Sequence, residues 1–318
     1  MTRSMERGPL MLGIEGVELA AADRERLLHP LVGGVILFTR NFENCEQLRG
    51  LTASIRALRD EPLLIAVDHE GGRVQRFRDG FTALPPMRSL GDTWDRDVSA
   101  AAQEATRIGH TIGAELRGHG IDLAFAPVLD LDYGASSIIG DRAFHANPNA
   151  VAHLAVALRE GLNAAGMAAC GKHYPGHGHV AADSHTDIPV DERSYATIAA
   201  DDLVPFAALA RAGLESMMAA HVIYPDVDRV PAGYSRKWCT SILRERIGFD
   251  GLLFSDDLGM AGAFTAGDIV ERADAAIAAG CDVALTCNDV KAAEELLSRW
   301  KPKAQPELAR RWRLVQGK

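Results

Sequence analysis

The sequence predicts an α/β protein of the (β/α)8 barrel type, with one domain over residues 1–318. Two observations support this prediction. Eight short apolar segments, each too short for a typical helix, alternate along the chain with helical patterns. Eight strands with their helices in about 300 residues also fit the usual size of this barrel. A doubly wound open sheet is the alternative, but no Gly-x-Gly-x-x-Gly turn follows the first segment.

The predicted strands are nearly continuous apolar runs, as expected for strands that are covered on both faces. In chain order they are 10–14, 34–38, 63–67, 123–128, 167–170, 216–220, 252–254 and 283–285. The predicted helices are 44–59, 93–118, 148–165, 196–212, 236–247, 267–279, 289–300 and 305–316. Ser235 is placed to cap the amino-terminal end of the 236–247 helix, and Gly248 is placed to end it.

Composition narrows the class of protein. The formal net charge of −9 argues against nucleic acid or an anionic membrane as the main partner. No apolar run approaches the roughly 18 residues that a membrane span requires. The five cysteines are sparse and odd in number, which indicates a reducing cytoplasm rather than a disulfide framework. We therefore expect a cytoplasmic protein, taken to be a monomer, that acts on a small molecule.

Polar side chains follow five of the predicted strands. In a barrel the carboxyl ends of all strands meet at one mouth, where active sites are built. Several polar groups at one mouth predict an enzyme with a small, polar substrate. The groups are Asp68 and Glu70 after the third strand, Asp130 and Asp132 after the fourth, Lys172 and His173 after the fifth, His221 after the sixth, and Asp256 and Asp257 after the seventh.

The segment 171–187 contains four of the eleven histidines and begins directly after the predicted strand 167–170. A loop rich in glycine and titratable groups after a buried strand is typical of catalytic loops. We expect residues 174–187 to form a mobile catalytic loop. Two chemistries fit these residues. A carboxylate nucleophile can act with a separate acid/base group. Alternatively, a metal can be bound by His173, His177, His179 and His185.

Two short runs in this region suggest a division of roles. If 183–185 is extended, Asp183 and His185 point to the same side, and the carboxylate can then fix the tautomer of the histidine for proton transfer. In Ser255-Asp256-Asp257, strand alternation lets only one aspartate face the pocket readily. The residues alone do not decide which aspartate that is.

These motifs together resemble a known family. The run 172–178 (Lys-His-Tyr-Pro-Gly-His-Gly), followed by Asp183-Ser184-His185, is similar to the signature loop of bacterial β-N-acetylglucosaminidases of glycoside hydrolase family 3. The runs 68–76 and 254–260 match two further motifs of that family. The resemblance is to short, single-domain cytoplasmic members that act in peptidoglycan recycling.

The resemblance implies roles for particular residues. It makes Asp256 the nucleophile, His185 the general acid/base and Asp183 the group that orients His185. It places Asp68, Arg76, Arg142, Lys172 and His173 in the sugar-binding site. The implied reaction removes a terminal N-acetylglucosamine with retention, through a covalent glycosyl-enzyme intermediate and without metal or cofactor. The implied substrate is N-acetylglucosaminyl-1,6-anhydro-N-acetylmuramic acid, with or without its peptide.

The chain departs from the family pattern at His69 and Tyr174, which look like neighbours of ligand groups and therefore bear on fine specificity. Other readings stay open beside the resemblance: a metal-dependent hydrolase, a phosphorylase or transferase, and a sugar-binding barrel that has lost catalysis. The joint presence of Asp183, His185 and Asp256 argues against the last of these.

Overall fold

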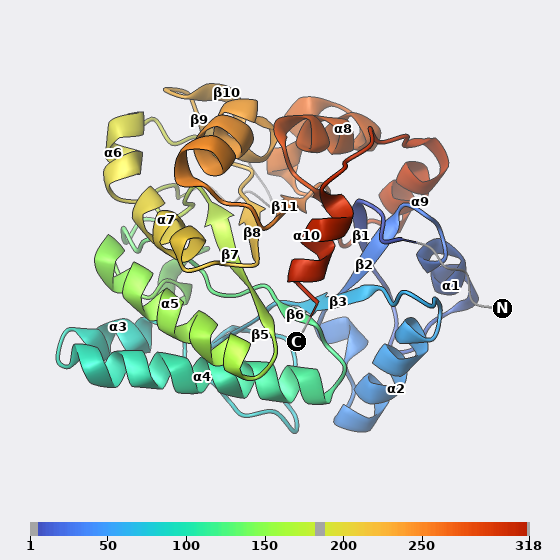
Figure 1. Cartoon of the computed structure of the whole chain (residues 1–318), viewed down its shortest axis with the longest axis horizontal. Helices are drawn as coiled ribbons and strands as arrows, with labels where there is room; N and C mark the ends of the chain where they lie inside the picture. Colours follow the sequence, from blue (N-terminus) through green and yellow to red (C-terminus); the bar gives the residue numbers. More distant parts are fainter. Residues whose placement is uncertain (1–5, 182–187, 317–318) are drawn as a thin grey trace.

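The computed structural model describes residues 6–181 and 188–316, and its centre is a closed barrel of eight parallel strands. The order around the barrel is β1-β12-β11-β8-β7-β6-β3-β2. The barrel confirms the predicted fold class, and Figure 1 shows its strands surrounded by helices. The strands are β1 (Leu10–Gly13), β2 (Val32–Leu37), β3 (Leu64–Val67), β6 (Leu123–Ala124), β7 (Ala168–Tyr174), β8 (Ser216–Ala219), β11 (Leu252–Asp257) and β12 (Val283–Thr286).

Each predicted apolar run overlaps one barrel strand, and the largest differences are at the carboxyl ends of two strands, β7 and β11, which extend three or more residues beyond the prediction. β7 continues through Lys172 and His173, because backbone pairing with its neighbours continues at its polar end: the Lys172 N–H donates to the Pro127 carbonyl over 3.2 Å. β11 likewise includes Asp256 and Asp257. The polar residues that the sequence placed after these strands therefore lie within them, where the barrel fixes their backbone.

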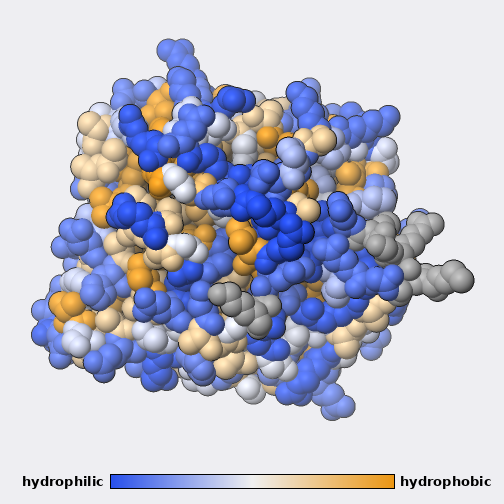
Figure 2. Space-filling model, viewed as in Figure 1, coloured by the Kyte–Doolittle hydropathy of each residue, from blue (hydrophilic) through white to orange (hydrophobic). Residues whose placement is uncertain are grey.

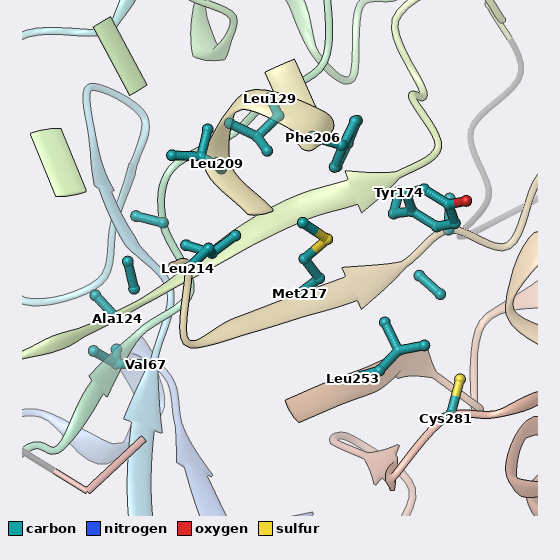
Figure 3. Close-up of a cluster of buried hydrophobic side chains, with 14 of the residues drawn as sticks. Val67, Ala124, Leu129, Tyr174, Phe206, Leu209, Leu214, Met217, Leu253 and Cys281 are labelled. Carbon is teal, nitrogen blue, oxygen red and sulfur yellow. The ribbon is translucent and has the colours of Figure 1, made fainter. Parts of the chain in front are cut away.

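Alternation along the strands divides the core into two layers. Leu252 and Phe254 belong to a cluster inside the barrel, whereas Leu253 belongs to a larger cluster between the strands and the surrounding helices. Figure 3 shows part of this outer layer, with Phe206 and Leu209 near strand β7. Successive side chains of a strand point to opposite faces, so β11 carries its even-numbered residues toward the barrel interior.

The helices around the barrel follow the prediction in the main. They are α1 (Ala21–Leu27), α2 (Cys45–Arg56), α3 (Arg88–Trp94), α4 (Val98–Gly118), α5 (Pro148–Ala164), α6 (Tyr195–Ala200), α7 (Leu203–Arg211), η4 (Lys237–Ile247), α8 (Ile269–Ala279), α9 (Val290–Arg299) and α10 (Leu308–Leu314). Short additions are η1 (Thr39–Asn41), η2 (Gly140–Arg142), η3 (Ala232–Tyr234) and η5 (Ala261–Ala266), and two small antiparallel pairs, β4 (His69–Gly71) with β5 (Val74–Gln75) and β9 (Ile223–Tyr224) with β10 (Asp228–Pro231).

The differences from the predicted helices have local causes. The predicted helix 93–118 corresponds to α4, which starts at Val98 because the Asp97 carboxylate accepts from the Ala100 N–H and caps it; residues 93 and 94 belong to the preceding helix α3. The predicted helix 196–212 is likewise divided into α6 and α7. Helix α1 was not predicted, because its seven residues bury only Asp23 and Leu27 and give no apolar repeat. The expected ends of η4 are confirmed: the Ser235 hydroxyl accepts from the Trp238 N–H, and Gly248 has a φ of +83°.

Helix α10 closes the amino-terminal end of the barrel. Trp312 belongs to the interior cluster, lies edge-on to Phe254 with ring centroids 6.1 Å apart, and donates its indole N–H to the Gly8 carbonyl. This end faces the viewer in Figure 1, and hydrophilic residues cover most of the same face in Figure 2. Among the described residues, no helix is both long and apolar enough to cross a membrane. Because α10 closes the amino-terminal end, a pocket within the barrel can open only at the carboxyl ends of the strands.

Candidate active site

A pocket of about 490 Å³ opens at the carboxyl ends of the strands. Its lining residues come from β2, β3, β6, β7, β8, β11 and β12 or from the loops that follow them. The pocket brings together six of the eight residues predicted for the site. They are Asp68, Arg76, Arg142, Lys172, His173 and Asp256. The other two, Asp183 and His185, lie outside the described residues.

A chain of ion pairs forms one wall of the pocket. The Lys172 Nζ lies 2.6 Å from Asp68 Oδ1 and 2.6 Å from Glu70 Oε1. Arg142 donates to both oxygens of Glu70, with Nε and Nη2 each at 2.8 Å. Arg76 Nη2 donates to Asp68 Oδ2 over 3.4 Å. Three cations therefore share two carboxylates, and Glu70 connects two of the predicted binding residues.

The buried position of this network fixes its charge. Burial acts to raise the pKa of Glu70, but contacts with Arg142 and Lys172 outweigh burial and hold that pKa well below its ordinary value. Burial acts to lower the pKa of Lys172, and the charges of Asp68 and Glu70 outweigh it, so this pKa is raised. The side chains of Lys172 and Glu70 are each 3% exposed. The wall therefore stays ionised near neutral pH, with its donors and acceptors held in place.

The remaining wall of the pocket is mainly apolar, with Phe38, Phe125, Met218 and Leu285 among its residues. Phe38 is itself flanked by cations: the guanidinium carbon of Arg40 lies 4.5 Å from its ring centroid and that of Arg76 lies 5.6 Å away. A pocket that combines charged and apolar surface suits a small ligand that carries hydroxyl groups and also has apolar faces.

The two aspartates of β11 have different surroundings. Asp256 follows Leu252 and Phe254 in the inward phase of the strand, borders the pocket and is partly exposed. Its Oδ1 accepts from the Asp257 N–H over 2.8 Å.

Asp257 is instead held by backbone groups. Its Oδ1 accepts from the N–H groups of Gly259 and Cys287, at 2.9 and 3.2 Å. Burial raises the pKa of Asp257 above its ordinary value. The carboxylate of Asp257 therefore braces the ends of β11 and β12, although Asp257 also lines the pocket. The carboxylate of Asp256 lines the same pocket and is the more exposed of the two.

A buried carboxylate orients the histidines of the pocket. Asp130 has no exposed surface; its Oδ2 lies 2.7 Å from His173 Nδ1, and its Oδ1 accepts from the backbone N–H groups of His173 and His177. Burial acts to raise the pKa of Asp130, but the adjacent His173 outweighs it and the pKa is lowered. Asp130 thus fixes His173 as a carboxylate fixes the tautomer of a catalytic histidine.

Sequence reasoning missed two members of this site. Glu70 and Asp130 were named only as polar residues that follow predicted strands, and neither was given a role in the site. Their partners lie 72 residues away at Arg142 and 43 residues away at His173. The available signal was their position at strand ends. His177 also lines the pocket, whereas His179 packs against Tyr133, with ring centroids 5.2 Å apart.

The metal reading gains no support from the described residues, among which no three His, Cys, Asp or Glu side chains are grouped to hold an ion. The ring centroids of His173 and His177 lie 6.1 Å apart, and the His179 Nδ1 is 3.6 Å from Asp191. His185, the fourth histidine of that reading, is outside the described ranges.

The two residues that depart from the family pattern are buried in the core. His69 is buried against Phe77 and Phe81, with ring centroids 6.0 and 5.6 Å away. The Tyr174 hydroxyl donates to the Trp238 carbonyl. Neither side chain lines the pocket. These residues adjoin pocket residues in the sequence, but their own side chains pack into the core, so an effect on specificity stays a prediction and would act through their neighbours.

His69 predicts a loss of stability in acid. Burial lowers its pKa from 6.5 to about 4, so the unfolded chain binds the proton more readily. The stabilising contribution of neutral His69 is complete above pH 6.5 and is lost as the pH falls toward 4. Between pH 7 and pH 5 this amounts to about 2 kcal/mol. In urea unfolding, the free energy of unfolding of His69→Leu should therefore fall by about 2 kcal/mol less than that of the unchanged protein between pH 7 and pH 5.

The control for this prediction is His110→Leu, which changes an exposed histidine on α4. It should show the same acid dependence as the unchanged protein. Equal losses in His69→Leu and the unchanged protein would show that His69 does not stay neutral in the folded state.

Comparison with known proteins agrees with this geometry. Residues 9–313 match the glycosyl hydrolase family 3 N terminal domain. The chain is 59% identical over 315 residues to a beta-hexosaminidase of Chromobacterium violaceum, covering 99% of this chain and 88% of the relative. It is 60% identical over 310 residues to one of Thiobacillus denitrificans, covering 96% and 86%.

Solved structures give the same result. The native NagZ structure from Neisseria gonorrhoeae has a TM-score of 0.94 and 50% identity, covering 98% of this chain and 91% of that one. A complex of the same protein with N-trifluoroacetyl-D-glucosamine has a TM-score of 0.94 and 51% identity over the same shares. The chain therefore belongs to glycosyl hydrolase family 3, in the group of its bacterial β-hexosaminidases.

Proposed function

We propose that the protein is a retaining exo-β-N-acetylglucosaminidase in which Asp256 is the nucleophile. The observation that carries this proposal is the position of Asp256, partly exposed at the end of β11 in the same pocket as the ionised wall of Asp68, Glu70, Lys172 and Arg142. Relatives of the chain are named as beta-hexosaminidases, and the structure of one relative contains an N-acylated glucosamine.

The pocket suits the end of a sugar chain. The charged wall offers fixed donors and acceptors to hydroxyl groups: the ammonium of Lys172, the guanidinium groups of Arg76 and Arg142, and the carboxylate of Asp68. Phe38 and Leu285 offer apolar surface to the faces of the ring. A volume of about 490 Å³ is in the range of pockets that enclose one small ligand. The non-reducing terminal sugar would bind here, with its anomeric carbon at Asp256.

The reaction proceeds in two steps. The Asp256 carboxylate attacks the anomeric carbon while His185 protonates the departing glycosidic oxygen, which gives a glycosyl ester and the released aglycone. His185 then removes a proton from water, whose oxygen attacks the anomeric carbon and releases Asp256. Two inversions give overall retention. Asp183 orients His185. The roles of Asp183 and His185 rest on the family motif, because both lie outside the described residues.

The physiological substrate we propose is N-acetylglucosaminyl-1,6-anhydro-N-acetylmuramic acid, with or without its peptide, in the recycling of peptidoglycan. The enzyme would act in the cytoplasm as a monomer, on a small molecule rather than on nucleic acid or at a membrane. All five cysteines are free, which supports a reducing compartment.

The test is a chromogenic assay on exhaustively chelated enzyme. The chelated enzyme should turn over an aryl β-N-acetylglucosaminide at the rate of untreated enzyme. This rate should be at least about tenfold higher than the rate with the matching β-glucoside. A site that hydrogen-bonds the amide of a substrate discriminates strongly against an analogue that lacks the amide. Loss of activity that zinc restores would revive the metal-dependent reading. A preference for the glucoside would contradict the substrate, and a sugar phosphate formed when phosphate is added would identify a phosphorylase.

A further inference from the structure

A second group of buried charges lies next to Gly176, one residue before the pocket-lining His177. We call it the Arg193 cluster; it comprises Tyr133, Asp191, Arg193 and Asp202. Arg193 Nε and Nη2 donate to Asp191, with the shortest contact at 2.7 Å. Arg193 Nη1 lies 2.8 Å from both Asp202 Oδ2 and the Tyr133 hydroxyl. That hydroxyl donates to Asp202 Oδ2 over 3.0 Å.

The Arg193 cluster is not arranged for greatest stability. One cation serves two carboxylates whose side chains are each 1% exposed. Burial raises the pKa of Asp202, with Arg193 and Tyr133 acting against it. Asp202 Oδ1 has no hydrogen-bond partner among the described residues. Buried ion pairs repay their desolvation poorly, so a cluster of this kind is better explained by the geometry that it fixes.

The first segment that the cluster holds is 176–179, which leaves the end of β7. Gly176 has a φ of +130°, and a β-carbon there would lie 2.8 Å from Asp202 Oδ1, so only glycine fits against the cluster. The Tyr224 hydroxyl donates to the Gly176 carbonyl. His179 packs edge-on to Tyr133, and its Nδ1 is 3.6 Å from Asp191 Oδ1.

The second segment is 189–193, which leads to helix α6. The Asp191 N–H donates to the Ile223 carbonyl over 2.8 Å, and the Ile223 N–H donates to the Pro189 carbonyl over 3.0 Å. This segment therefore pairs with β9 while its Asp191 and Arg193 side chains complete the Arg193 cluster. Residues that precede and follow 183–185 in the sequence thus contact the partners of one guanidinium group, that of Arg193.

We propose that Arg193 is a positioning residue for the acid/base step: it holds together segments 176–179 and 189–193, which precede and follow in the sequence the residues Asp183 and His185 that the proposed function assigns to proton transfer. This inference rests on the proposed function, which assigns proton transfer to His185. Arg193 does not line the pocket and takes no part in the bond changes. Its effect should therefore appear in the two steps that use His185, and in the first of them it should grow with the need of the leaving group for a proton.

The test compares an aryl N-acetylglucosaminide with a poor leaving group, phenyl, and one with a good leaving group, dinitrophenyl. General acid catalysis contributes about 10²- to 10⁴-fold, and only the poor leaving group needs it. Arg193→Met should lower kcat/KM, which reports the first step, about 30-fold for the phenyl glycoside and less than about threefold for the dinitrophenyl glycoside. Arg193→Lys keeps the charge but loses the forked contact, so it should retain only part of the phenyl activity.

The matched control is Arg244→Met. Arg244 Nη2 lies 2.8 Å from Asp282, and its side chain is 13% exposed, as is that of Arg193. Asp282 precedes β12, at the end of the barrel remote from the pocket. This variant should be destabilised but treat both substrates alike. Should Arg193→Met not fold, Tyr133→Phe removes one hydroxyl of the Arg193 cluster and should show the same selective loss, to a smaller degree.

His185→Ala separates the inference from the function on which it rests. If His185→Ala selectively loses the phenyl substrate and the Arg193 and Tyr133 variants do not, the positioning role is wrong and the proposed function stands. An equal loss on both substrates in Arg193→Met, or a selective loss in Arg244→Met, likewise overturns it. If His185→Ala itself shows no selectivity, the acid role fails and the inference falls with it.

Discussion

Replacing Asp256 by alanine is expected to lower kcat/KM for an aryl N-acetylglucosaminide by about 10⁴-fold or more, as removal of a nucleophile does in other covalent mechanisms. The variant should fold normally, because Asp256 is partly exposed and its Oδ1 accepts one local bond, from the Asp257 N–H. The measurements are kinetics and thermal unfolding of the purified variant. A rate within about tenfold of the unchanged enzyme would exclude Asp256 as the nucleophile.

The neighbouring aspartate supplies a matched control. The backbone N–H groups of Gly259 and Cys287 both donate to Oδ1 of Asp257, and an asparagine side chain also has an oxygen at this position. Burial also raises the pKa of Asp257, so the folded protein disfavours its charge and a neutral asparagine gives up less at this position. Asp257→Asn should therefore keep most of the activity. A mechanism-based fluorosugar should label Asp256 in the unchanged enzyme, and labelling of Asp257 would reverse the assignment.

The barrel was predictable because its strands are covered on both faces and so appear as continuous apolar runs. This signal weakens where strands become polar. β7 and β11 were predicted to end at 170 and 254, although the barrel continues to Tyr174 and Asp257. Backbone pairing with neighbouring strands, which has no local sequence signature, holds these polar ends. Helix α1 was missed for the opposite reason, because a short, mostly charged helix gives no apolar repeat.

The site was predictable as a set of residue types at strand ends, but not as a network. Its family motifs supplied Asp68, Lys172 and Arg142. Glu70 forms the ion pairs that hold Lys172 and Arg142 in place and keep them charged, and Asp130 holds His173. A buried carboxylate acts through partners far along the chain, and a single sequence does not show which distant cation it meets.

Glu70 therefore carries the second large prediction. Glu70→Gln keeps the size of the side chain but leaves Lys172 and Arg142 with one carboxylate fewer. Breaking a buried ion pair by removing one partner typically costs about 3 kcal/mol or more. Both cations should also shift, and a misplacement of about 1 Å in a binding group can cost about 10²-fold in rate. We expect kcat/KM to fall by at least about 10²-fold, together with a lower free energy of unfolding in urea.

Asp141→Asn is the control for Glu70→Gln, because Asp141 is next to Arg142 on η2 but forms an exposed pair with Arg73 at 3.3 Å, with both side chains 48% exposed. Exposed pairs contribute at most about 1 kcal/mol, so this variant should resemble the unchanged enzyme. Because the pKa of Glu70 is held well below its ordinary value, the pair is intact throughout the neutral range, and the loss in Glu70→Gln should be the same at pH 6 and pH 8. A loss that is present at pH 8 but shrinks at pH 6 would mean that Glu70 takes up a proton in this range, as the neutral variant then resembles the unchanged enzyme, and that the ionised wall does not have the fixed charge on which sugar binding depends.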